Sequence, residues 1–189
     1  MAKRTVGFLV GTVLLLCAAA IRADDYGDTV KVFKNAGASQ EFFSNSYGYA
    51  VFPTIGKGGL GVGGAYGKGR VYKQGKYVGD TSLTQLSFGL QAGGQAYSEI
   101  IFFQDQRALD EFTSGNFEFG ADASAVAITA AAGASASTAG SSAGASGGKN
   151  DATTVGNYRK GMAVFTVVKG GAMYQAALSG QKFKYTPKG

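Results

Sequence analysis

One stretch, AVFPTIGKGGLGVGGAYGKGR at residues 50–70, limits what this chain can fold into more than any other part of it. A short apolar segment runs into a region crowded with glycine and lysine. Glycine-rich segments cradle phosphate groups when a helix begins directly behind them, because the positive N-terminus of the helix then faces the anion. The residues that follow therefore decide between a nucleotide site and another use of the positive charge.

A nucleotide site does not fit the rest of this stretch. The pattern G-x-G-x-x-G occurs at residues 59–64, and Asp80 stands at the distance of a ribose-binding acid. The next residues, AYGKGRVY, hold two more glycines and then a strand pattern, so no helix of useful length can begin there. A Walker loop fails as well, because Gly58 follows Lys57 where Ser or Thr must hold magnesium. We therefore expect neither a nucleotide nor a nucleic acid as a partner.

The N-terminus has the pattern of a secretory signal peptide. Lys3 and Arg4 precede an apolar run at residues 6–20, and small residues suited to cleavage follow. We therefore expect residues 1–23 to be a signal peptide and residues 24–189 to form a single domain. The pattern predicts an exported protein of the periplasm or cell surface, associated peripherally with the membrane.

The single cysteine, Cys17, lies inside this signal. A lipoprotein signal has a small residue before its cysteine, but three leucines precede Cys17, so ordinary cleavage near Ala23 is favoured and a lipid anchor on Cys17 is the alternative. The expected mature chain then contains neither cysteine nor histidine, and the commonest nucleophile, base and zinc ligands are missing. We therefore expect a non-enzyme without cofactor or metal.

Two pairs of acids remain as conceivable catalytic groups. Asp110 and Glu111 occupy adjacent helix positions, whose side chains diverge. Glu118 and Asp122 fit an exposed strand face. Both pairs are better explained as solvated surface acids, because nothing in the surrounding sequence supports catalysis.

Positive charge is concentrated in one region of the expected mature chain. That chain has 15 basic and 12 acidic residues, a small excess that says little about partners. Between residues 53 and 79, however, there are five basic side chains and no acidic one. The five residues are Lys57, Lys68, Arg70, Lys73 and Lys76. They predict a local positive patch on a nearly neutral domain.

Three helices are predicted. Tyr26, Val30 and Phe33 recur at helical spacing, with acidic residues at the start of the segment and lysines towards its end, which suits the helix dipole. Ser39 is expected to cap a second short helix. Asp105 is expected to cap a third helix in the middle of the chain.

The remaining pattern is that of strands. Apolar, β-branched and aromatic segments with alternating polarity occur at residues 49–55, 69–72, 76–78, 85–91, 97–103 and 117–127. Pro53 marks an edge or a bulge in the first of these, and residues 73–75 form a hairpin turn. The predicted fold class is α+β, with a largely antiparallel glycine-rich β-sheet, two N-terminal helices and one central helix.

Two features of the second half of the chain bear on its organisation. Residues 121–148 consist almost wholly of Ala, Gly, Ser and Thr, so a low-complexity loop is expected at about 131–150. The segment GYAVF at 48–52, with Lys-Gly-Gly following, is echoed by GMAVF at 161–165, again with Lys-Gly-Gly following. The echo indicates two related strand units placed symmetrically in one sheet, or two similar hairpins by coincidence.

The motifs of this chain resemble those of the SYLF lipid-binding domain family. They are YGYAVFP (47–53) with GKGG (56–59), GGQA (93–96), DQRAL (105–109), and KGMAVF (160–165) with KGG (169–171). The resemblance covers nearly all of residues 26–186 and is closest to the bacterial secreted branch. Yeast members of this family are also described as actin-binding.

The resemblance implies a phospholipid-binding domain that uses a basic surface and an amphipathic N-terminal helix. The matching positions are Lys57 in the Gly-Lys-Gly-Gly turn, Lys169 in its echo, and Lys31 and Lys34 on the first helix, with Val30 and Phe33 in the membrane interface. Charge alone adds Lys68, Arg70, Lys73 and Lys76. Tyr66, Tyr72 and Tyr77 are amphipathic residues suited to such an interface.

Two observations bear on the ligand. In eukaryotic members the resemblance implies phosphatidylinositol phosphates, but this chain has no tryptophan and has YVGDT (77–81) where a Trp-Ser-Pro-like turn is expected. An exported bacterial protein also rarely meets phosphoinositides or actin, so we expect an anionic phospholipid or membrane surface as the partner. The alternative is a structural domain of the cell envelope that binds a protein partner through a glycine-rich sheet edge.

Overall fold

The computed structural model describes residues 23–120, 123, 125–128, 157–170 and 178–189. The expected signal peptide up to residue 22, Asp122 and the expected loop at 131–150 lie outside the described residues. The elements in chain order are α1 (Ala23–Asn35), α2 (Gly37–Asn45), β1 (Gly48–Lys73), β2 (Lys76–Phe103), α3 (Gln106–Phe112), β3 (Phe117–Glu118), β4 (Ala125–Ile128), β5 (Met162–Gly170) and β6 (Gln181–Pro187).

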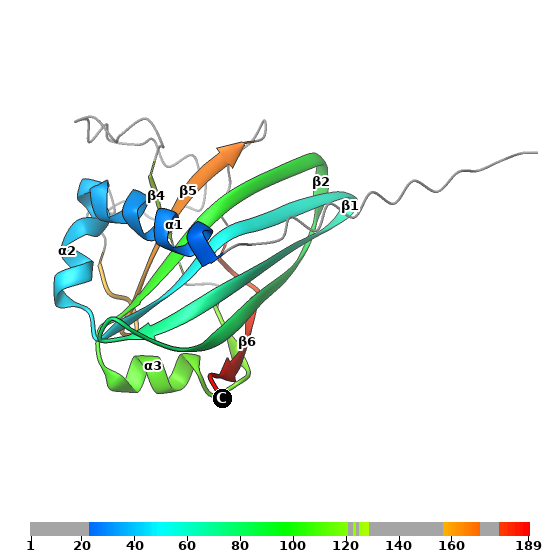
Figure 1. Cartoon of the computed structure of the whole chain (residues 1–189). Coiled ribbons are helices and arrows are strands. Elements are labelled where there is room, and N and C mark those ends of the chain that lie inside the picture. Colours follow the sequence, from blue (N-terminus) through cyan, green and yellow to red (C-terminus); the bar gives the residue numbers. More distant parts are fainter. Residues whose placement is uncertain (1–22, 121–122, 124, 129–156, 171–177) are drawn as a thin grey trace, which may run out of the picture.

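A single long antiparallel hairpin, β1 with β2, forms the centre of the fold (Figure 1). Its turn residues Gln74 and Gly75 both have positive φ, 48° and 78°, as a two-residue hairpin turn of type I′ requires. The predicted hairpin turn is therefore confirmed. The predicted glycine-rich turn at 56–59 is wrong, because β1 continues through it and Lys57 pairs with Gln95 of β2. Pairing along the whole of β2 overrides the weak strand propensity of glycine.

The hairpin is also folded back on itself. Figure 1 shows both strands reversing direction at the end of the molecule away from α3. After the reversal Gly67 lies against Ile55 and Gly69 against Phe52; a Cβ on either glycine would come within 2.6 Å of the facing side chain. Glycine is required at these positions because the two arms of β1 approach so closely.

The sheet has the strand order β3-β6-β2-β5-β4, with β1 paired to β2 in addition. The start of β2 pairs with β6 and its end with β5. All pairs are antiparallel except β4 with β5, so the predicted α+β class with a largely antiparallel sheet is confirmed. The two segments of the sequence echo lie on either side of the same part of β2: Ala50 and Val164 both register with Ile101.

Two hydrophobic cores hold the sheet and helices together. The inner core lies inside the curled sheet and is closed by α3; it includes Phe52, Leu83, Ile101, Phe103, Phe112 and Phe183. The outer core lies between the sheet and helices α1 and α2, which run along one side of it (Figure 1). It includes Phe33, Phe42, Phe102, Phe165 and Val167. Within the described residues, the outer core includes no side chain of β6 or of the first part of β2.

Local predictions for the helices had mixed outcomes. Asp105 caps α3 as expected, since its Oδ1 accepts a hydrogen bond from Ala108 N at 2.8 Å. Ser39 does not cap α2: it is buried within the helix and donates to Phe33 O at 2.6 Å. Ala36 takes the N-cap position instead, because it is the only residue between α1 and α2 and leaves no room for a separate capping residue.

The strand expected from residue 117 is interrupted. The described part forms only Phe117–Glu118, paired with β6, and Ala125–Ile128, paired with β5. These two short strands lie at opposite edges of the sheet order. The continuous strand predicted at 117–127 is therefore wrong, because the chain crosses from one edge to the other within it.

Candidate functional site

Strands β1 and β6, on either side of β2, present lysines on a common outer face of the sheet. Lys68 of β1 and Lys184 of β6 both register with Ser82 of β2. Side chains of registered residues lie on the same face, and the strand spacing puts the two lysines about 10 Å apart across Ser82. Both lysines are exposed, and neither has an ion-pair partner among the described residues. Their positive charge is therefore open to an external anion.

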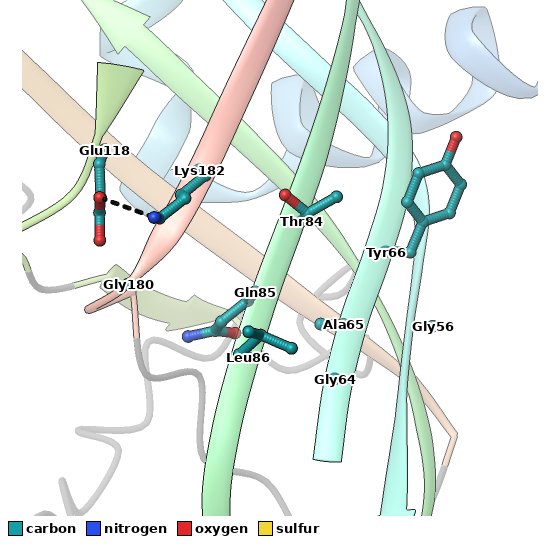
Figure 2. A pocket seen from close by; sticks show the side chains of 10 residues that line it. All are labelled: Gly56, Gly64, Ala65, Tyr66, Thr84, Gln85, Leu86, Glu118, Gly180 and Lys182. Carbon is teal, nitrogen blue, oxygen red and sulfur yellow. Dashed lines mark ion pairs between the residues drawn. The ribbon is translucent and has the colours of Figure 1, made fainter. Parts of the chain in front are cut away.

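The neighbouring row continues this face. Tyr66 of β1 and Lys182 of β6 both register with Thr84 of β2 (Figure 2). Lys182 Nζ lies 3.5 Å from Glu118 Oε2 on β3, a solvent-exposed ion pair that contributes little to stability. We call the set Lys68, Lys182 and Lys184 the lysine face.

The outer face ends in exposed apolar side chains. Leu86 registers with Gly64, and alternation along β1 places Val62 and Tyr66 on the same side as Gly64. Leu86 is 75% exposed, Val62 60% and Tyr66 52%. We call these three residues the apolar tip. A hollow of about 660 Å³ lies beside it, and its lining includes Tyr66, Leu86, Gln85 and Lys182 (Figure 2).

Arg70, which the sequence places in the basic patch, faces outward but is half-buried against other side chains of the molecule. Its guanidinium carbon lies 4.3 Å from the centroid of the Tyr26 ring on α1 and 5.3 Å from that of Tyr77. Its Nε lies 3.9 Å from Asp80 Oδ1. Burial raises the pKa of the Tyr26 phenol despite the opposing charge of Arg70. Arg70 therefore fixes the start of α1 to the sheet.

The other predicted basic residues do not gather at one place. Lys73 lies 5.1 Å from the Tyr47 ring, and the adjacent Lys76 is exposed at the hairpin turn. Lys169 donates from Nζ to Thr54 Oγ1 at 3.1 Å. Lys57 is half-buried within β1. The hairpin turn and the apolar tip lie at opposite ends of the folded hairpin, so the patch predicted from sequence is divided between them (Figure 1).

The apolar stripe of α1 packs onto the sheet. Phe33 is fully buried in the outer core, and Val30 is half-buried against the same core. Lys31 pairs with Asp28 at 3.0 Å, and Lys34 Nζ lies 5.4 Å from the Phe43 ring. The helix therefore offers its lysines to solvent, whereas Phe33 could contact lipid only if α1 left the sheet.

Sequence reasoning missed two parts of this site. Lys182 and Lys184 alternate with Phe183, which indicates a half-buried strand, but their position beside Lys68 depends on pairing between distant segments.

The second part is buried Glu99, which the sequence shows only as an acidic residue inside an apolar strand. It accepts a hydrogen bond from Gln181 Nε2 at 3.2 Å, and burial raises the pKa of its carboxyl to about 8. Glu99 links β2 to β6 beneath the outer face.

The described ranges hold neither a cluster of metal ligands nor a helix that could cross a membrane. Among residues 23–120, 123, 125–128, 157–170 and 178–189, no three acidic, histidine or cysteine side chains gather as metal ligands do. In the same ranges no helix has the length and apolar character needed to cross a membrane.

Comparison with known proteins identifies the family. The family model Ysc84, described as "Las17-binding protein actin regulator", matches residues 84–185, more than half of the chain. Beta cell expansion factor A of Aeromonas veronii is 28% identical over 171 residues, which is 87% of this chain and 56% of that protein. The chain thus spans little more than half of this relative's length. On the family match, the chain belongs to the Ysc84 family, the SYLF-domain family that its motifs resemble.

Proposed function

We propose that this protein is a non-enzymatic domain that binds anionic phospholipid at a membrane surface through its lysine face. The observation that carries the proposal is the registered row of Lys68, Ser82 and Lys184 on an exposed face. Each lysine near an anionic membrane contributes about 1 kcal/mol. The two lysines of this row would supply about 2 kcal/mol, which is roughly thirtyfold in affinity; Lys182 adds less, because Glu118 lies beside it.

Other basic residues take different parts in this proposal. Lys31 and Lys34 on α1, together with Lys57, Lys73, Lys76 and Lys169, form a dispersed positive field around the domain rather than the contact itself. Arg70 is excluded from the contact because its guanidinium is held by Tyr26 and Asp80. Export to the periplasm or cell surface, with peripheral membrane association, belongs to the same proposal.

A protein partner at the sheet edge is the second candidate. Within the described residues β3 pairs only with Phe183 and Lys182 of β6, so the outer edge of β6 continues unpaired towards Pro187. An unpaired edge can accept a strand from a partner. Lysine and proline on an edge, however, are the residues with which proteins prevent strand addition. Lys184 and Pro187 occupy this edge, and lipid is therefore the favoured ligand.

The family description fits this proposal in a limited way. It names a protein that binds Las17 and regulates actin, which are properties of the proteins on which the family was described. A lipid-binding role for this chain is supported by the charge of its surface rather than by those names.

Vesicle flotation tests the proposed function. The expected mature chain, residues 24–189, is mixed with phosphatidylcholine vesicles that contain or lack phosphatidylglycerol, at low and high salt. We expect flotation only with the anionic vesicles, and less of it at high salt, because the attraction depends on charge and salt screens it beyond a Debye length. Equal flotation with both vesicle types, or none with either, would overturn the proposal.

A further inference from the structure

We propose that the apolar tip, formed by Val62, Tyr66 and Leu86, enters the bilayer at the boundary between headgroups and acyl chains. This inference rests on the proposed function. It adds the orientation of the protein on the membrane and the depth to which its tip enters the bilayer. It assigns the bent end of the β1–β2 hairpin as the part of the molecule that penetrates the membrane.

The three side chains form one surface by the register of the strands. Leu86 of β2 faces Gly64 of β1, and Val62 and Tyr66 stand two residues to either side of Gly64 on the same face. Gly64 has no side chain to cover Leu86, which is accordingly 75% exposed. Leu86, Val62 and Tyr66 are three of the four large hydrophobic residues that are exposed in the described part of the chain.

Their position relative to the lysine face matches the layers of a membrane. Tyr66 shares the row of Lys182, and Leu86 lies two residues beyond that row, about 7 Å further along the strand. Apolar side chains of peripheral proteins enter about 5–10 Å below the headgroups, and tyrosine favours the interface itself. The order lysine, tyrosine, leucine along this face therefore follows the order headgroup, interface, hydrocarbon.

The surroundings of the tip favour a bilayer over a protein. A stable protein interface buries about 1,200 Å² or more in total, and three apolar side chains at the end of a hairpin are far from that. Lys68, Lys182 and Lys184 stand directly behind the tip and complement an anionic surface. Val62 directly follows the irregularity in the pairing of β1 at Leu60, and the end of the molecule where β1 and β2 reverse carries no helix (Figure 1). The three side chains of the tip are 52–75% exposed and so are open to a flat surface.

The lack of tryptophan in this chain allows a direct test. L86W places a single fluorophore at the tip, and V32W places one on α1, where Val32 is the fourth exposed large hydrophobic residue at 47%. Both proteins are mixed with anionic phosphatidylcholine–phosphatidylglycerol vesicles, with and without brominated acyl chains. We expect a blue shift and bromine quenching for L86W and neither for V32W. In parallel, V62S/L86S should weaken vesicle binding at high salt about tenfold.

The outcomes separate this inference from the proposed function. If the protein floats with anionic vesicles and L86W is not quenched, the insertion is wrong and surface binding stands. Quenching of V32W alone would place the contact on α1 and overturn the inference. A concentration-dependent blue shift of L86W without vesicles would show that a second copy covers the tip, and would overturn it also. Absence of flotation for every variant would overturn both proposals.

Discussion

Lys68 of β1 and Lys184 of β6 both register with Ser82 of β2, so the last strand of the chain completes a row of charge begun near its middle. Neither lysine is engaged by an acid within the described residues. By contrast, Arg70, only two residues from Lys68 along β1, is held between Tyr26 and Tyr77. Lys68 and Lys184 therefore face solvent, whereas Arg70 stabilises the packing of α1 on the sheet.

Two single substitutions, R70A and K68A, test whether Arg70 stabilises the fold and Lys68 does not. R70A should lower the free energy of unfolding by about 1–2 kcal/mol, because the guanidinium loses its partly buried contact with Tyr26. K68A, on the same strand, should change it by less than about 0.5 kcal/mol. Urea denaturation measures both. The reverse order of effects, or equal effects, would show that Arg70 does not fix α1.

The two halves of β1, before and after its reversal, approach so closely that one added methyl group should lower the stability of the fold. In G69A the new Cβ would meet the Phe52 ring at 2.6 Å and Val51 O at 2.9 Å, so we expect a loss of about 1–3 kcal/mol. G56A is the matched control, since nothing lies within 4 Å of its Cβ. Denaturation midpoints of the two variants that coincide would contradict the folded-back arrangement.

Glu99 predicts how stability depends on pH. Burial raises the pKa of its carboxyl from 4.5 to about 8, so the folded chain holds a proton that the unfolded chain releases above about pH 4.5. Stability from this residue is complete below pH 4.5 and is lost as the pH rises to about 8. E99Q keeps a neutral group that can still accept from Gln181, and should lose this slope.

The expected difference is on the order of a few kcal/mol in favour of E99Q at pH 8, shrinking towards pH 5. Urea denaturation of wild type and E99Q at both pH values measures it. E99A serves as the second variant, because it removes one of the two acceptors of the Gln181 amide and should be destabilised at either pH. A constant difference between wild type and E99Q across this range would contradict the account of Glu99.

Features fixed by neighbouring residues were predictable from the sequence. The Asp105 cap and the turn at Gln74 and Gly75 depend on side chains and backbone angles within a few positions, and both are confirmed. The α+β class follows from the same local patterns. The strand at 97–103 was also expected, and it forms the end of β2, with buried apolar residues on both faces.

Features fixed by distant pairing were not predictable. Residues 56–69 have the composition of a loop, and they form a strand only because β2 supplies a partner along its whole length. Once this pairing is known, glycines and basic residues are seen to alternate between the two faces of β1. Gly67 and Gly69 face inward, and Lys68 and Arg70 face outward. The expected lipid contact of Phe33 ignored the sheet on which α1 packs, where Phe33 is fully buried.

The most direct test of the central claim is the affinity of K68A/K184A for anionic vesicles, beside that of K73A/K76A. The two variants lose the same formal charge, but the second pair lies at the hairpin turn, away from the lysine face. We predict that K68A/K184A binds at least about tenfold more weakly at low salt, while K73A/K76A binds nearly as wild type does. Equal weakening by both pairs, or by neither, would contradict a lipid site on the outer face of β1, β2 and β6.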